Sequence, residues 1–186
     1  MSENWIAGAW LTLMLFWAAG AATAKRAVRR EAVSSRLLHI VPTMAAFFLL
    51  FRGGNIGIFH ARFVPDSNLI RLTGTALTFA GLAFAIWARM TLGGNWSGTI
   101  TVKQDHQLVR TGPYRMVRHP IYSGILLAMF GTALFFGELR GLIGFAIAFI
   151  AWWSKSRTEE QFMLEVFGDQ YSRYRSEVKA LIPAVL

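Results

Sequence analysis

The residues best suited to chemistry lie in the C-terminal half, and the first group surrounds the start of an expected helix. Gly112-Pro113 is typical of a turn. Pro120 suits the first turn of a helix, where its missing N–H costs little. A helix N-terminus flanked by Arg118 and His119 can bind an anion such as a carboxylate or a phosphate. The alternative is that these two side chains only anchor a helix end among lipid headgroups. Five ionisable or aromatic side chains lie within this short segment, and their density favours a functional site. They are Tyr114, Arg115, Arg118, His119 and Tyr122.

A second polar stretch begins at Lys155 and forms the tail of the chain. We expect Glu159 and Glu160 to begin a helical run, where the helix dipole alone could explain them. A carboxylate pair near a membrane could also bind a cation or accept hydrogen bonds from a ribose. Gly168 predicts a helix break. The spacing of the next polar residues places them on one helical face, which would pack against the preceding helices; they are Tyr171, Tyr174 and Arg175.

The elements that must position these residues are apolar helices. Hydrophobic residues make up 54% of the 186-residue chain and charged residues 16%, well below the usual quarter. We therefore predict an all-α polytopic transmembrane bundle with about five spans. They lie at 5–24, 37–51, 72–90, 121–137 and 141–153. The second contains Pro42, and its extension as far as residue 59 stays open, as does full crossing by the second and fifth runs.

Short connections and small residues refine this arrangement. Only residues 138–140 separate the last two runs, which predicts a tight antiparallel helical hairpin. The fifth run is short and either tilts or continues as a helix into the polar tail. The third run carries small residues that permit close helix contact, namely Gly74, Thr78, Gly81 and Ala85. We treat residues 1–186 as one integral membrane domain, with three spans in 1–90 and a cofactor-binding catalytic region in 91–186.

The charge pattern predicts an orientation and excludes several classes of protein. Of 19 Lys and Arg residues, 15 lie in 25–36, 89–118 and 155–179, which predicts that these segments and the C-terminus are cytosolic. The cations alternate with apolar runs, so the net charge of +9 does not indicate a nucleic-acid partner. The absence of Cys excludes disulfides and zinc–thiolate sites. No metal-ligand spacing, dinucleotide fingerprint or P-loop is present, so no metal is expected.

Several short sequence motifs within residues 90–184 together resemble the signature of the isoprenylcysteine carboxyl methyltransferase family. They are His106-Gln-Leu-Val109, Gly112-Pro-Tyr114, Arg118-His-Pro-Ile-Tyr-Ser-Gly124, Glu159-Glu160, Phe167-Gly168, Tyr171, Tyr174 and Leu181-Ile-Pro183. The string RHPxYxG alone is less specific, because phospholipid methyltransferases and sterol reductases share a similar C-terminal region. The combination with the two glutamates and the paired tyrosines is more specific.

The resemblance implies S-adenosylmethionine as methyl donor and S-adenosylhomocysteine as product, bound on the cytosolic side. The carry-over by position assigns the donor pocket to His106, Leu108, Val109, Tyr114, Arg118, His119, Pro120, Tyr122 and Glu159. Tyr114 and Tyr122 can pack on the adenine or near the sulfonium. His119 suits the methionine carboxylate, and Glu159 can accept from the amine or the ribose.

The resemblance also implies a lipophilic or prenylated acceptor that enters from the bilayer, with membrane lipid as the surroundings. Eukaryotic prenylcysteine enzymes have an Arg four residues before this Glu, where this chain has Lys155 and then Arg157. We assign these two residues and Glu160 to the acceptor and the chemistry. An amine acceptor would need a base, for which Glu160 and Tyr171 are candidates.

The expected enzyme is thus a membrane methyltransferase, multi-pass in a bacterial inner membrane. A phospholipid N-methyltransferase, an NADPH-dependent reductase and a non-enzymatic interaction protein remain alternatives.

Overall fold

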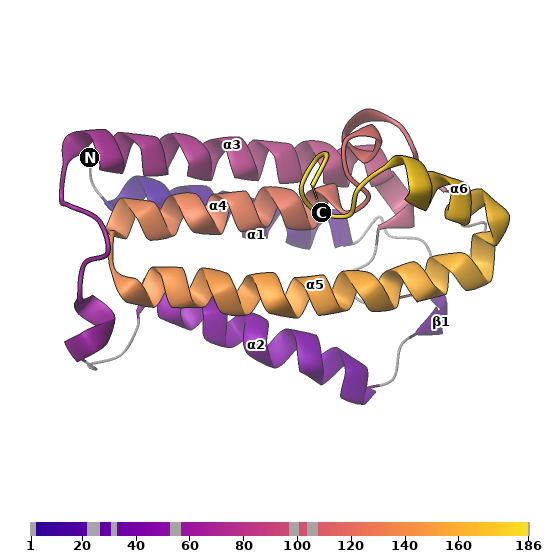
Figure 1. Cartoon of the computed structure of the whole chain (residues 1–186), viewed down its shortest axis with the longest axis horizontal. Coiled ribbons are helices and arrows are strands. Elements are labelled where there is room, and N and C mark those ends of the chain that lie inside the picture. Colours follow the sequence, from indigo (N-terminus) through magenta and orange to yellow (C-terminus); the bar gives the residue numbers. More distant parts are fainter. Residues whose placement is uncertain are drawn as a thin grey trace.

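The computed structural model describes residues 3–21, 27–30, 33–52, 57–96, 101–103 and 108–185. Long helices that run side by side make up most of it (Figure 1). The α-helices are α1 (Glu3–Ala21), α2 (Val33–Phe51), α3 (Asn68–Leu92), α4 (Pro120–Phe136), α5 (Leu139–Phe167) and α6 (Asp169–Glu177). Short 3-10 helices are η1 (Gly57–His60), η2 (Gly93–Asn95) and η3 (Gly112–Arg115). Strands β1 (Ala27–Arg30) and β2 (Thr101–Lys103) pair antiparallel, with Ala27 opposite Lys103.

The described parts of all five predicted apolar runs are helical, apart from Gly137, which ends α4. The strand pair is an addition that no sequence pattern predicted. The open extension of the second run is resolved, because α2 ends at Phe51 and Gly57–His60 forms a separate 3-10 turn. Residues 22–24 of the first predicted run lie outside the described residues.

The most extensive helix pair is α3 against α4, and small residues bring the two backbones into contact. A Cβ added at Gly81 would lie 2.5 Å from the backbone nitrogen of Ala128. One at Gly74 would lie 2.6 Å from the carbonyl oxygen of Gly131. Thr78, also on the predicted small face of α3, is fully buried and lies 3.2 Å from Thr132 between their hydroxyl oxygens. The prediction of close contact through these small residues is confirmed.

The predicted hairpin of α4 and α5 is also present. Gly137 ends α4 with φ +70°, a left-handed conformation that glycine adopts without strain, and α5 begins two residues later. On the far side of α5, Gly144 lies against α2, where a Cβ would come within 2.6 Å of the Ala46 carbonyl oxygen. The hairpin therefore packs between α3 on one side and α2 on the other (Figure 1).

Helix α5 continues through the polar tail to Phe167, for 29 residues. The fifth run therefore continues as a helix into the polar tail, which was one of its two options. One expectation is corrected, because Glu159 and Glu160 lie well inside a helix rather than beginning one. Helical hydrogen bonding does not depend on side-chain polarity, so the change from apolar to polar sequence at Lys155 did not mark a helix start. Gly168 then ends α5 with φ +49°, as predicted.

Within the described residues, one helix is both long and apolar enough to span a bilayer by itself, namely α3. Two shorter apolar helical stretches are Ser35–Phe51 and Pro120–Phe136. Large apolar side chains are exposed on several helices, including Leu11, Met14, Leu38, Met44 and Ile150.

Candidate active site

The two polar stretches meet where the start of α4 faces the polar part of α5. His119 precedes the first residue of α4 and is buried between two carboxylates. Its Nε2 lies 3.2 Å from Glu160 Oε1, and its Nδ1 lies 3.4 Å from Glu159 Oε2. A protonated imidazole can donate from both nitrogens at once, so this geometry suits the imidazolium.

Arg118 forms the shortest ion pair of this cluster. Its Nε and Nη2 donate to Glu160 Oε1 at 2.9 and 2.6 Å, and both side chains are almost entirely buried. Arg175 adds a third cation, with Nε 3.3 Å from Glu160 Oε2. A buried carboxylate is costly unless it is paired, and Glu160 meets this condition through three cations from two segments of the chain.

Tyr122 lies one turn into α4 and contacts the second carboxylate. Its hydroxyl donates to Glu159 Oε1 at 2.6 Å, and its ring stacks on His119 with centroids 5.6 Å apart. Lys155 places its Nζ 5.3 Å from the centre of the Tyr122 ring. An aromatic ring that already attracts a side-chain cation is a suitable surface for a ligand cation.

The ionisation states follow from this pairing. Burial opposes the charged form of His119, but the hydrogen bonds to Glu159 and Glu160 outweigh it and raise the pKa of the imidazole. Burial also opposes the charge on Glu160, yet His119 and Arg118 hold the pKa of that carboxyl at about 2. The pKa of Glu159 is likewise lowered, because His119, Lys155 and Tyr122 together outweigh its burial. The pairing therefore favours the charged forms of His119, Glu159 and Glu160.

The tail after α6 closes over the start of α4. The backbone N–H groups of Arg118 and His119 donate to the carbonyls of Lys179 and Ala180 at 2.8 and 3.0 Å. Tyr171 and Tyr174 are both buried, as their shared helical face predicted. The Tyr174 hydroxyl donates to the Tyr114 carbonyl at 2.6 Å, which fixes η3 against α6.

The structure brings together most of the predicted site residues, but not all. His106 lies outside the described residues. Leu108 and Val109 are half-buried ahead of η3, while Tyr114 within η3 and Pro120 at the start of α4 are buried. Arg157 is exposed and packs its guanidinium over Trp153 at 4.4 Å, and the described residues show no contact between it and the cluster.

The surroundings of Glu160 do not favour the predicted role in acceptor chemistry. The residue is 2% exposed, and with a pKa of about 2 its carboxylate is a poor proton acceptor at neutral pH. Arg118 and His119 use its charge, so Glu160 holds the site together rather than reaching an acceptor. Tyr171 is no substitute, because burial raises the pKa of its hydroxyl.

Sequence reasoning missed Arg89, which lies at the end of α3. Its Nη1 and Nη2 donate to the carbonyls of Gly93 and Gly20 at 2.9 and 2.7 Å, and its guanidinium lies over Trp96 at 4.4 Å. It thereby ties α1, α3 and η2 together beneath η3. A lone arginine at the end of an apolar run was the available signal.

Comparison with known proteins shows the family to which the chain belongs. The family model described as phospholipid methyltransferase matches residues 69–170, which include both Arg118-His119 and Glu159-Glu160. The chain therefore belongs to the phospholipid methyltransferase family. It is similar to the protein-S-isoprenylcysteine O-methyltransferase of Schizosaccharomyces pombe, with 33% identity over 53% of this chain and 43% of the relative. The enzyme of that name from Saccharomyces cerevisiae is 30% identical over 64% of this chain and 51% of the relative.

A solved structure shares the fold. The eukaryotic intramembrane Ras methyltransferase, an isoprenylcysteine carboxyl methyltransferase, aligns with a TM-score of 0.55 and 22% identity. The alignment covers 85% of this chain and 55% of that protein. The chain thus spans about half the length of the relatives that it matches.

Proposed function

We propose that this chain is an S-adenosylmethionine-dependent membrane methyltransferase that esterifies the carboxylate of an isoprenylcysteine-like acceptor. The observation that carries the proposal is the cluster of His119, Tyr122 and Glu159 at the polar end of an apolar helical hairpin. The names of the fungal relatives support the same reaction.

The residues of the cluster fit the methyl donor by their chemistry. S-adenosylmethionine supplies a methyl group on a sulfonium, an amine, a carboxylate and ribose hydroxyls. The Glu159 side chain is 22% exposed, so it can accept from the amine or the ribose. The Tyr122 ring, already close to Lys155, offers a π-face to a cation. Arg118 and His119 supply positive charge near the start of α4 for an anionic group.

The state of the ionisable groups favours a carboxylate acceptor over an amine. In methyl transfer to a carboxylate, the S–CH₃ bond breaks as the O–CH₃ bond forms, and no proton has to move. An amine must lose a proton. The pKa values of Glu159 and Glu160 are lowered and those of His119 and Tyr171 are raised, so none of these four is a suitable base. The cluster is therefore better suited to O-methylation.

Lys155 is the residue that we assign to the acceptor carboxylate. It lies one turn before Glu159 on α5, on the side of the Tyr122 ring. A lysine ammonium pairs with a carboxylate as a point charge, without the two parallel hydrogen bonds of arginine. It would hold the nucleophilic oxygen near the donor methyl, and positioning is most of what this reaction requires.

The membrane placement is part of the proposal. The exposed apolar side chains on α1, α2 and α5 would face lipid, and the hairpin would cross the bilayer with the cluster at the cytosolic end. A multi-pass arrangement with about five spans, in a bacterial inner membrane, fits the distribution of Lys and Arg. The acceptor would then reach the cluster from the bilayer.

Calorimetric titration of the detergent-purified protein with S-adenosylhomocysteine and, separately, NADPH tests the donor. We expect micromolar binding of the former alone, with Glu159→Gln weakening it at least tenfold and Glu165→Gln, an exposed control on the same helix, leaving it unchanged. NADPH binding alone would indicate a reductase. Binding of neither ligand to folded protein would favour an interaction protein.

A methyl transfer assay then tests the acceptor. We expect label from the donor to reach a prenylated cysteine with a free carboxylate, and Lys155→Gln to raise KM for that acceptor more than it lowers kcat. Lys155→Arg should restore KM. Transfer to phosphatidylethanolamine instead would make the chain a phospholipid N-methyltransferase, the function that the family description names.

A further inference from the structure

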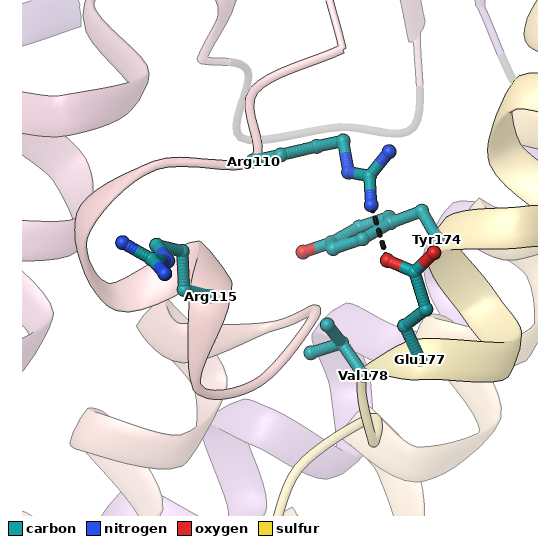
Figure 2. A pocket seen from close by; sticks show the side chains of 5 residues that line it. All are labelled: Arg110, Arg115, Tyr174, Glu177 and Val178. Carbon is teal, nitrogen blue, oxygen red and sulfur yellow. Dashed lines mark hydrogen bonds and ion pairs between the residues drawn. The ribbon is translucent and has the colours of Figure 1, made fainter.

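A cleft of about 310 Å³ lies beside the cluster, because Val178 lines it and the Val178 carbonyl accepts a hydrogen bond from Arg118 Nη1. Figure 2 shows the cleft, which shares no side chain with the cluster. It is lined by Arg110, Arg115, Tyr174, Glu177 and Val178. Its volume lies at the small end of the range for ligand sites in proteins, which is about 300–1,000 Å³. Two arginines against one glutamate give the lining a net positive charge, so an anion is the ligand class that it suits.

The two arginines differ in how they are engaged. Arg110 pairs with Glu177, with Nη2 2.5 Å from Oε2, and its guanidinium lies 5.2 Å from the centre of the Tyr174 ring. Arg115 is exposed and, among the described residues, has no ion-pair partner. Figure 2 shows the Arg110 guanidinium beside the Tyr174 ring, and the Arg115 side chain beyond the Tyr174 hydroxyl and directed away from Arg110. An anion in the cleft would contact Arg110 directly, and the exposed Arg115 would reach the same anion after a change of side-chain rotamer.

We propose that this cleft binds a phosphate group. A phosphate oxygen pair matches the planar fork of a guanidinium, as a carboxylate does. The phosphate would replace Glu177 on Arg110 and add Arg115 as a second partner. Glu177 thus holds Arg110 in place when the cleft is empty and competes with the ligand when it is not.

The surroundings favour the headgroup of a membrane lipid as the source of the phosphate, an inference that rests on the proposed membrane insertion. Three large apolar side chains are exposed nearby. Met116 directly follows Arg115, and Ile182 and Val185 lie in the C-terminal tail. Val117 and Lys179 form a parallel backbone bridge, which brings the segment around Arg115 next to the C-terminal tail. Apolar side chains beside an arginine-lined cleft suit the boundary between lipid tails and headgroups. A soluble phosphate ester is the other source of the same chemistry.

Titration of the detergent-solubilised protein, followed by native mass spectrometry, tests the proposal. The probes are phosphatidic acid, the diacylglycerol with the same acyl chains and glycerol 3-phosphate. We expect phosphatidic acid to bind and diacylglycerol to bind at least tenfold more weakly. Arg110→Gln and Arg115→Gln should each weaken phosphatidic acid binding about tenfold, which is the loss of one charge-assisted contact. Glu177→Gln should strengthen it, because Arg110 loses its competitor.

Arg173→Gln is the matched control. Arg173 is exposed on α6, the helix that carries Tyr174 and Glu177, but it does not line the cleft. Equal binding by the parent and both arginine variants, an equal loss in the Arg173 variant, or weaker binding after Glu177→Gln would each overturn the proposal. Competition by glycerol 3-phosphate would show that the site also accepts soluble esters. A parent that binds phosphate through Arg110 and Arg115 but not S-adenosylhomocysteine would count against the proposed function alone.

Discussion

The α3–α4 interface and the cluster around His119 hold the same helix, α4, by opposite means. Along its length, α4 meets α3 through small residues such as Gly124 and Gly131, and the contacts are between backbones. At its start, α4 is held by Arg118 and His119, which pair with carboxylates of α5. Close packing of small residues stabilises the α3–α4 interface, whereas ion pairs stabilise the start of α4.

The difference has a physical reason. Within an apolar bundle, close packing is the main attraction between helices, because lipid is as apolar as the side chains. At the polar end, charged groups can be buried only as neutralised sets. The interface should therefore respond to volume and be indifferent to pH, whereas the cluster should respond to charge and to pH.

The largest effect is expected from Glu160→Gln. It leaves Arg118 and His119 without their shared carboxylate, which should reduce the free energy of unfolding by about 3 kcal/mol. Equilibrium unfolding in mixed micelles measures it, with Glu165→Gln as control. The double variant Arg118→Met/Glu160→Met should lose less than Glu160→Gln alone, because no buried charge is left unpaired and Arg175 is 43% exposed. A loss no greater than that of the control would show that the cluster contributes no more than surface charge.

The pH dependence of stability should come from the cluster. The raised pKa of His119 means that its contribution is complete below about pH 6.5 and is lost as the pH rises through the folded-state pKa. The lowered pKa of Glu160 gives the reverse limb, with a contribution complete above pH 4.5 and lost as the pH falls toward about 2. Loss of one proton from His119 leaves the Arg118–Glu160 pair intact, so the alkaline loss should be smaller than that caused by Glu160→Gln. Unfolding curves between pH 5 and 9 measure it, and His119→Gln should flatten the alkaline limb. An unchanged limb in this variant would assign the pH dependence to another group.

Gly81→Ala tests the interface by volume alone. The added Cβ would fall 2.5 Å from backbone atoms of α4, so the helices must separate, at a cost of about 2 kcal/mol. Gly8→Ala in α1 is the matched control, because its Cβ would meet nothing within 4 Å and alanine favours a helix by up to about 1 kcal/mol. The two variants should therefore change the thermal midpoint in opposite directions. Equal shifts would mean that the α3–α4 contact is looser than described.

Trp10→Phe should give the smallest effect. It removes the hydrogen bond from Trp10 Nε1 to Thr132 Oγ1, a polar contact of 3.0 Å inside the apolar region, and should cost about 1 kcal/mol. Thr132 keeps its contacts with Thr78 and the Ala128 carbonyl. Thermal unfolding measures it, with Trp5→Phe at an exposed position as control. A loss comparable to that of Glu160→Gln would contradict the division between the two regions.

Local patterns predicted the parts of the fold that depend on nearby residues. The hairpin followed from the short 138–140 connection, the end of α5 from Gly168, and the close face of α3 from its glycines. Each depends on backbone freedom or side-chain size, which a short stretch of sequence contains. The continuation of the fifth run as a helix through residues 154–167 was one of two options left open. A change from apolar to polar side chains predicts where a helix leaves the lipid, but it does not predict where the helix ends.

The candidate site was predicted as a set of residues but not as a set of pairs. The resemblance brought His119 and Glu159 together, while the Arg118–Glu160 pair joins residues 42 positions apart and requires the relative rotation of α4 and α5. That rotation depends on packing along the whole hairpin. The role of Arg89 depends equally on three-dimensional proximity, since its acceptor at Gly20 lies 69 positions away.

The uninterrupted course of α5 constrains how this protein can change during evolution. Glu159 lies twenty residues after Leu139, so it stands about 30 Å from the hairpin turn, close to the thickness of a bilayer core. Exchange of one apolar residue for another between them leaves that distance intact. Insertion or deletion of a single residue would move the carboxylates by about 1.5 Å along the axis and turn them by roughly a quarter of a revolution, away from His119. Homologous chains should therefore vary in the composition of this segment while keeping its length.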